Sequence, residues 1–145
     1  MNIDVNAYSG SCHCGSIGFC YRTNQPPGTW SIRACKCRFC QAHAALTTSD
    51  SSGTIEFREY HVGMLRRYRF GQCITDFLLC RSCGVYIGAE CKTKSCRRGI
   101  ININALRPIP SEIGPITGMD SGTESIEQRI ARRETRWSQV VDIVA

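Results

Sequence analysis

The sequence predicts a mainly β fold that holds two zinc ions and ends in an α-helix. The first observation is a series of short apolar segments, spaced about ten residues apart, that alternate with turn-forming residues. The second is a set of seven cysteines separated by gaps of one or two residues, which is a spacing typical of metal ligands. The third is an amphipathic stretch near the C-terminus, where apolar residues recur with the period of a helix.

The strand candidates occupy most of the chain. Its 145 residues suit one domain with its own hydrophobic core. Two of the segments are expected to form a hairpin around Gly71, and the whole pattern is typical of an antiparallel all-β domain. Residues 1–11 lead into this domain. The segments with strand character are 17–22, 29–34, 44–48, 54–57, 65–70, 75–79, 85–89 and 99–104.

The C-terminal part is expected to differ from the rest. We predict a zinc-binding domain over residues 1–107, followed in 108–145 by an irregular segment and a helix that packs on the same domain. Residues 107–122 hold three prolines and three glycines, which favours irregular structure. Ser125 and Gln128 have the spacing of a capping box, so a helix is predicted over 124–142. Its apolar stripe, interrupted by Arg133, is expected to dock on the β domain, and a dimer contact or a lid is the alternative.

Cysteine usage and composition indicate a reducing environment. No run of about 18 apolar residues exists, so no membrane span is expected. The N-terminus lacks a basic leader and an apolar stretch, so we expect no signal peptide and a cytoplasmic location.

Eleven cysteines cannot all pair within one chain, which favours metal binding over disulfides. Cys20 is expected to be a core residue, Cys73 has no predicted role, and a disulfide between Cys91 and Cys96 is disfavoured.

The net charge favours small anions over nucleic acid. The formal charge is +6, and seven thiolates offset by two divalent ions remove three units, which leaves +3. In one basic segment, strand alternation places Arg67 and Arg69 on the face opposite Arg66, Tyr68 and Phe70. A solvated face is the first explanation for these arginines, a site for a substrate carboxylate is the second, and nucleic acid is the third.

Four cysteines in two distant half-sites predict an enclosed zinc ion. Cys12 and Cys14 form a CxC motif, Cys80 and Cys83 form a CxxC motif, and a glycine follows each motif. Glycine tolerates positive φ where the backbone turns back around a metal. Sites made of four cysteines are usually closed and structural, and this one would close a loop of about 65 residues. We call these residues the four-cysteine centre and expect His13, which lies between two of the ligands, to face solvent.

Three cysteines within six residues predict a second zinc ion with an open position. Cys35, Cys37 and Cys40 form a CxCxxC motif, which we call the three-cysteine centre. No second CxxC motif remains to complete it. Three protein ligands with a vacant position are typical of catalytic zinc, which can bind a thiolate, polarise a carbonyl or acidify water.

His43 follows this motif by three residues, and its role leaves alternatives open. It could be a fourth ligand that closes the centre, a catalytic acid or base beside the metal, or a residue that only packs and forms hydrogen bonds. We carry it as the candidate catalytic residue.

The cysteine pattern resembles the glutathione-dependent formaldehyde-activating enzyme family, which also includes centromere protein V. The resemblance covers about residues 8–107 and implies a β-tent of stacked small antiparallel sheets. It further implies a structural zinc in the four-cysteine centre and a second zinc in the three-cysteine centre, where the thiol of glutathione can approach. The family forms or breaks carbon–sulfur bonds, as in S-hydroxymethylglutathione. The residues that carry the resemblance are 10–15, Cys35, Cys37, Cys40, 77–84 and 101–106.

Two functions follow as expectations. The first is a zinc-dependent carbon–sulfur lyase that acts on a small thiol or thioether, such as a glutathione conjugate, with the substrate sulfur at the open zinc. The second is a non-catalytic module in which both zinc ions are structural and a basic surface contacts nucleic acid or a protein. We expect no membrane and no nucleic acid as partners, and the apolar C-terminal helix is compatible with a homodimer.

Overall fold

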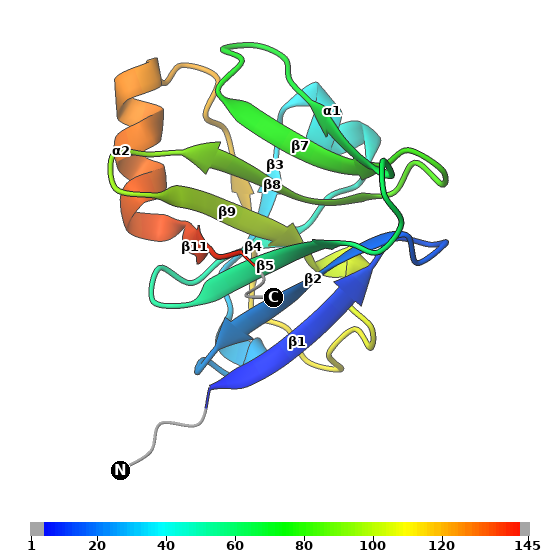
Figure 1. The fold of residues 1–145 in the computed structure, drawn as a ribbon. Helices are drawn as coiled ribbons and strands as arrows, with labels where there is room; N and C mark the ends of the chain where they lie inside the picture. Colours follow the sequence, from blue (N-terminus) through cyan, green and yellow to red (C-terminus); the bar gives the residue numbers. More distant parts are fainter. Residues whose placement is uncertain (1–4, 143–145) are drawn as a thin grey trace.

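The structure, a computed structural model, describes residues 5–142 and confirms a mainly β fold with a C-terminal helix (Figure 1). Turn residues separate the strands as the sequence predicts. The hairpin around Gly71 is present, and its glycine has a φ of 62°. The strands are β1 (Asn6–Ser11), β2 (Ile17–Thr23), β3 (Ile32–Cys35), β4 (Thr47–Thr48), β5 (Thr54–Glu59), β6 (Leu65–Tyr68), β7 (Thr75–Cys80), β8 (Tyr86–Lys92), β9 (Arg97–Asn102), β10 (Ile116–Met119) and β11 (Ser138–Val140), and the helices are α1 (Arg38–Ala42), α2 (Ile126–Arg136) and the short 3-10 helices η1 (Pro27–Thr29) and η2 (Ile103–Ala105).

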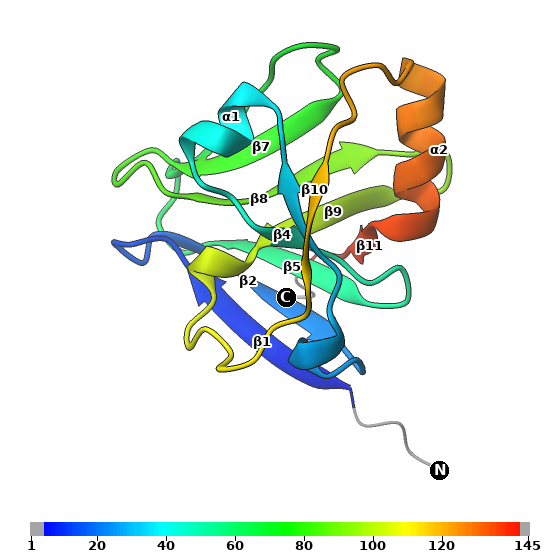
Figure 2. The ribbon, with the colours of Figure 1, turned by 180° about the vertical axis from the view of Figure 1, so that it is seen from behind.

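The strands form one branched sheet, and the branch point is β9. One edge of β9 pairs with β8, and the sheet continues from there through β7 to β6. The other edge is divided, because Arg98 and Gly99 pair with β11 whereas Ile101 and Asn102 pair with β4. One branch continues through β5 and β2 to β1, and the other through β3 to β10. In Figure 2 the β3–β10 branch crosses in front of β8 and β9, so the sheet folds back over itself.

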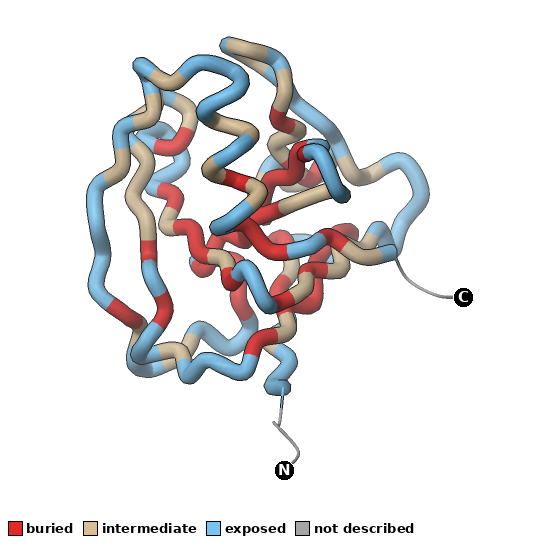
Figure 3. The backbone as a smooth tube through the Cα atoms, turned by 90° about the vertical axis from the view of Figure 1, so that its left-hand side faces the viewer, coloured by how far each residue is buried: buried red, intermediate tan, exposed pale blue. Residues whose placement is uncertain are grey.

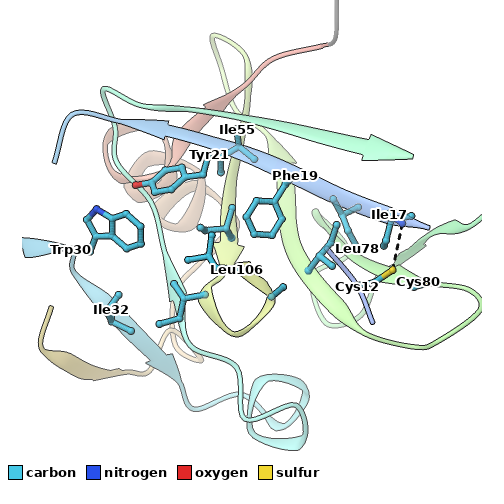
Figure 4. Close-up of a cluster of buried hydrophobic side chains, with 14 residues drawn as sticks. Cys12, Ile17, Phe19, Tyr21, Trp30, Ile32, Ile55, Leu78, Cys80 and Leu106 are labelled. Atoms are coloured by element: carbon cyan, nitrogen blue, oxygen red, sulfur yellow. Dashed lines mark hydrogen bonds between the residues drawn. The ribbon is translucent and has the colours of Figure 1, made fainter. Parts of the chain in front are cut away.

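Two clusters of buried side chains fill the interior, and each reaches one of the predicted metal centres. The larger cluster extends from Trp30 and Ile32 at one end to Cys12 and Cys80 at the other (Figure 4). The smaller cluster joins Cys40 to buried side chains of β8 and β9 and to Trp137, which directly precedes β11. In Figure 3 buried residues concentrate in the middle of the tube and exposed ones in the connecting loops. Packing therefore fixes both centres against the core.

The C-terminal part departs from two sequence predictions. The helix covers Ile126–Arg136 and not 124–142, because at Trp137 the backbone becomes extended (ψ 152°) and enters β11. Of the apolar residues that were expected to continue the helical stripe, Trp137 is the C-cap, Val140 lies in β11 and Val141 follows this strand. Val144, which the predicted stripe also included, lies outside the described residues. Residues 107–122, predicted to be irregular, contain β10, which pairs parallel with β3. The predicted capping box of Ser125 and Gln128 is confirmed.

Neither helix of the described residues is long and apolar enough to cross a membrane. The longer one, α2, has 11 residues and carries several charged side chains.

The approach of β10 to β3 depends on Gly114. A Cβ atom at this position would lie 1.7 Å from the carbonyl oxygen of Trp30, so the backbone would have to move. We expect Gly114→Ala to lower the free energy of unfolding by about 2–3 kcal/mol, the upper part of the range for overpacking. Denaturant unfolding measures this change. Gly28→Ala is the matched control, because its nearest contact would be Glu112 at 3.8 Å, and equal losses in both variants would contradict the prediction.

Candidate metal centres and the cavity beside them

The four-cysteine centre is assembled from the two half-sites that the sequence predicts. Cys12 and Cys14 follow β1, whereas Cys80 ends β7 and Cys83 lies in the next turn. All four sulfur atoms lie within 4.8 Å of one another. The turn before β2 and the turn before β8 thus meet, although 66 residues separate Cys14 from Cys80.

The local backbone explains why this arrangement forms. Gly15 and Gly84 both have a φ of 80°, as the glycine after each cysteine motif predicts. Backbone amides of Ile17 and Cys83 donate to the sulfur atoms of Cys12 and Cys80, each at 3.4 Å. Such donors stabilise thiolates and orient them as ligands.

The spacing of the sulfur atoms fits a zinc ion. Zinc–sulfur bonds of about 2.3 Å in a tetrahedron place neighbouring sulfurs about 3.8 Å apart. The sulfur of Cys14 lies 3.8 Å from that of Cys12 and 3.5 Å from that of Cys80. Hydrogen bonding with the Ser16 hydroxyl, 3.2 Å away, lowers the pKa of Cys14 to about 6. His13 is exposed beside the centre, as predicted.

The three-cysteine centre lies where β3 ends and α1 begins. Cys35 is the last residue of β3, Cys37 is the N-cap of α1, and Cys40 lies within the helix. Their three sulfur atoms also lie within 4.8 Å of one another. The Cys37 sulfur accepts a hydrogen bond from the Cys40 amide at 3.4 Å, so the cap itself directs this sulfur toward the others. The sequence analysis did not predict α1.

The close grouping of the three sulfurs suits a cation. Hydrogen bonding from the Cys40 thiol lowers the pKa of Cys35 to about 5, and the same interaction raises the pKa of Cys40. Three adjacent thiolates repel one another, and a divalent ion among them removes this penalty. The Tyr86 hydroxyl is buried with no hydrogen-bond partner in the described structure. Burial raises the pKa of Tyr86, and the nearby sulfurs of Cys40 and Cys35 raise it further.

His43 lies at the end of α1, exposed to solvent. Its ring packs on Phe39 with centroids 4.5 Å apart, and on Tyr86 at 5.6 Å. Among the described residues, the group of ligand atoms that includes Cys35, Cys37 and Cys40 does not include His43. The structure thus places His43 in an aromatic cluster around Phe39, and its catalytic role stays a prediction.

A cavity of about 370 Å³ lies beside the three-cysteine centre. Cys35, Cys37 and Cys40 form part of its wall, and His43 is not among the described residues that line it. Its other lining residues include the β6–β7 turn, the end of β10 with the residues that follow it, and one side of α2. Lys36 donates its amide to Met119 at 2.8 Å, which ties the end of β10 to the metal-binding segment. The volume is at the small end of the range for ligand sites.

Basic side chains dominate the charge of this cavity. The lining residues from α2 are Arg129, Arg132 and Arg133, which recur at the i, i+3 and i+4 positions of one helix face. Arg33 contributes from β3, two residues before Cys35 and on the same side of the strand. The basic lining residues are Arg33, Lys36, Arg129, Arg132 and Arg133, and Asp120 is the acidic one among the described lining residues.

These arginines and Tyr86 are the residues that sequence reasoning missed. The i, i+3, i+4 spacing of the α2 arginines is visible in the sequence, but the prediction treats Arg133 only as an interruption of the apolar stripe. In the structure Arg133 is 6% exposed whereas Ile126 is 41% exposed, so the helix does not simply dock an apolar stripe. The position of Arg33 two residues before Cys35 was the available signal for the β3 contribution.

The basic segment at β6 is balanced by acids in the structure. Arg67 pairs with Asp76 at 3.0 Å and with Glu90, and Arg69 pairs with Asp76 at 2.5 Å. Tyr68 lies on the other face, where its ring stacks on Phe39. The predicted alternation is confirmed, and Arg67 and Arg69 form ion pairs with acidic side chains of β7 and β8.

The remaining cysteines are free thiols outside both centres. Cys20 is a buried core residue, as predicted, and Cys91 is buried as well. Cys73 is exposed at the cavity rim, where it has a positive φ of 57°. No disulfide joins Cys91 to Cys96.

Comparison with solved structures identifies a similar fold. A crystal structure of a Rhodobacter sphaeroides protein superposes with a TM-score of 0.56 and 23% sequence identity, over 75% of this chain and 99% of that one. At this identity the likeness concerns the fold alone. A scan against protein-family models and a search of curated proteins found no match.

Proposed function

We propose that the protein is a zinc-dependent lyase that makes or breaks a carbon–sulfur bond of a small thiol conjugate. The observation that supports this proposal is the position of the three-cysteine centre at the wall of a cavity. Its three sulfurs make an incomplete tetrahedron, whereas the four-cysteine centre is complete. The resemblance of the cysteine motifs to the formaldehyde-activating family supports the same reaction class.

The residues of the chain have separable tasks in this proposal. Cys35, Cys37 and Cys40 would hold a zinc ion at the cavity wall. Bound there by three thiolates, the ion would offer a fourth position that stabilises a substrate thiolate. In cleavage of a hydroxymethyl thioether, the carbon–sulfur bond breaks with its electron pair on sulfur, and the hydroxyl proton leaves as the carbonyl forms. Asp120 is the carboxylate that the described residues bring to this cavity, and we assign it as the proton acceptor.

A cobalt-substituted protein tests whether the second centre is open. Cobalt(II) binds in the same geometry as zinc and absorbs visible light in a way that reports its sulfur ligands. We expect 2-mercaptoethanol to change the spectrum saturably, because a fourth sulfur joins the three-cysteine centre while the four-cysteine centre is already complete. We also expect the zinc protein to accelerate exchange between the free thiol and its formaldehyde adduct, measured by NMR. An unchanged spectrum together with an unchanged exchange rate would instead support the alternative, a binding module with two structural metals.

A further inference from the structure

The arginines that line the cavity carry more positive charge than the acidic side chains of the described residues around them balance. Arg133 is 6% exposed, and its guanidinium has only neutral hydrogen-bonding neighbours among the described residues: Nη1 donates to the Thr75 hydroxyl at 2.6 Å, and the Cys91 thiol lies close by. Within the described part of the chain, Nε of Arg133 is buried without a hydrogen-bond partner. The guanidinium lies over the Trp137 ring, 4.2 Å from the centroid, which orients it without neutralising it. Burying a charge without an opposite charge is costly.

The negative groups near the arginines do not balance their charge. Asp120 is the acidic side chain among the described residues that line the cavity, and the thiolates of the three-cysteine centre would be largely offset by the metal ion that they hold. Burial raises the pKa of the Cys91 thiol close to Arg133, so this thiol stays neutral. Glu124 is engaged elsewhere, since it accepts two hydrogen bonds from Arg132 at 2.8 and 2.9 Å and lies 3.6 Å from Nε of Arg129. Arg132 still has a buried Nη1 without a partner after this pairing.

The four arginines gather on one cavity, because Arg33 on β3 lines it together with Arg129, Arg132 and Arg133 of α2. Burial lowers the pKa of Arg133; the Cys91 thiol works against this shift, and repulsion from Arg132 and Arg129 adds to it. The hydroxyl of Ser49, 2.6 Å from Arg33, is a neutral partner. The cluster is thus built at an electrostatic cost that a bound anion would remove.

We propose that Arg33, Arg129, Arg132 and Arg133 form a subsite for an oxyanion, so that the substrate is a small thiol or thioether bearing a sulfonate, phosphate or carboxylate group. Guanidinium groups offer several donors in a planar fork and suit such oxyanions better than an ammonium group does. The same cavity contains the three sulfurs, so one ligand of modest size spans both parts. This inference rests on the proposed function for the sulfur end and on the arginine cluster alone for the anionic end.

A matched pair of thiols tests the subsite. In the cobalt-substituted protein we compare 2-mercaptoethanesulfonate with 2-mercaptoethanol, which share the sulfur and the two-carbon chain. We expect the sulfonate to bind at least tenfold more tightly, and cysteamine to bind more weakly than either. Carboxylate and phosphate analogues of the same length then identify which oxyanion is preferred. Equal dissociation constants for the sulfonate and the alcohol would overturn the inference and leave the open metal position intact.

Variants assign the preference to the cluster. Arg133→Gln is expected to reduce the sulfonate preference to less than threefold without changing the affinity for 2-mercaptoethanol. Arg66→Gln removes the same charge from an exposed strand position outside the cavity, and should keep the preference. Arg33→Gln is the second test if Arg133→Gln does not fold, as judged by the spectrum of cobalt in the four-cysteine centre. A preference that survives in both cavity variants would contradict the proposal.

Sulfate separates the subsite from the proposed chemistry. If no thiol alters the cobalt spectrum, the proposed function fails, and calorimetric titration of the zinc protein with sulfate then tests the arginine cluster alone. We expect saturable binding that Arg133→Gln or Arg33→Gln abolishes and Arg66→Gln retains. Absence of sulfate binding, or binding that is equal in all variants, would overturn the subsite.

Discussion

Replacing Cys80 with serine is expected to lower the free energy of unfolding by about 3–5 kcal/mol, a large part of the stability of a domain of this size. Cys80 is 2% exposed and belongs to both the four-cysteine centre and the larger core cluster. Loss of one ligand leaves buried thiolates around a weakened metal site, and breaking a buried charge pair costs about 3–5 kcal/mol. Domains of this kind have a total stability of only about 5–15 kcal/mol. Thermal unfolding by circular dichroism, with the zinc content of each variant, measures the effect.

Cys20→Ser is the control for this experiment. Cys20 is also buried, at 4% exposure, but lies outside both centres. It therefore measures the cost of placing a hydroxyl in the core without loss of a ligand. We expect a fall in stability of about 1–3 kcal/mol and two zinc ions per chain. If Cys80→Ser were as stable as Cys20→Ser, the four-cysteine centre would not hold the fold together.

Each cysteine motif was predictable because its geometry is local, whereas the meeting of the two half-sites of the four-cysteine centre joins segments 66 residues apart. A glycine after each half-site predicts a backbone turn, and both glycines have the positive φ that such a turn requires. The CxxC and CxCxxC spacings bring sulfurs together without help from distant segments. Strand positions were similarly predictable, since alternation and turn residues act over a few positions.

The cavity was not predictable in the same way, because it depends on long-range pairing. β10 is a short strand between proline-rich and glycine-rich segments, and it forms by pairing with β3 about 80 residues earlier in the chain. The residues after α2 are compatible with either a longer helix or a strand. They form β11 because they pair with β9 on one side and β5 on the other, which are both distant in the sequence. The arginines that line the cavity are less exposed than charged residues usually are. Such departures from local rules are common at functional sites, and sequence patterns do not predict them.

Replacing Cys37 with serine is expected to abolish thiol binding and exchange while the fold persists. Its ligand group lies within six residues, so the metal there closes a far shorter loop than the one between Cys14 and Cys80. Closing a loop of 66 residues costs about 2 kcal/mol more conformational free energy than closing one of six residues. Cys37 is also the N-cap of α1, and serine is among the best N-cap residues. The variant should therefore lose less than about 1 kcal/mol of stability.

The functional loss should be far larger than the structural one. Changing a residue that only orients a ligand costs about 10–100-fold in metal affinity or activity, and Cys37 is itself a ligand in our proposal. We expect zinc content to fall from two ions to one and the exchange rate to fall more than about 100-fold. Cys96→Ser, which changes a thiol outside both centres, should retain both. If Cys37→Ser lost one zinc ion yet kept full exchange activity, the three-cysteine centre would not be the site of the chemistry. Together with Cys80→Ser, the result would separate a metal ion that holds the fold from one that acts on substrate.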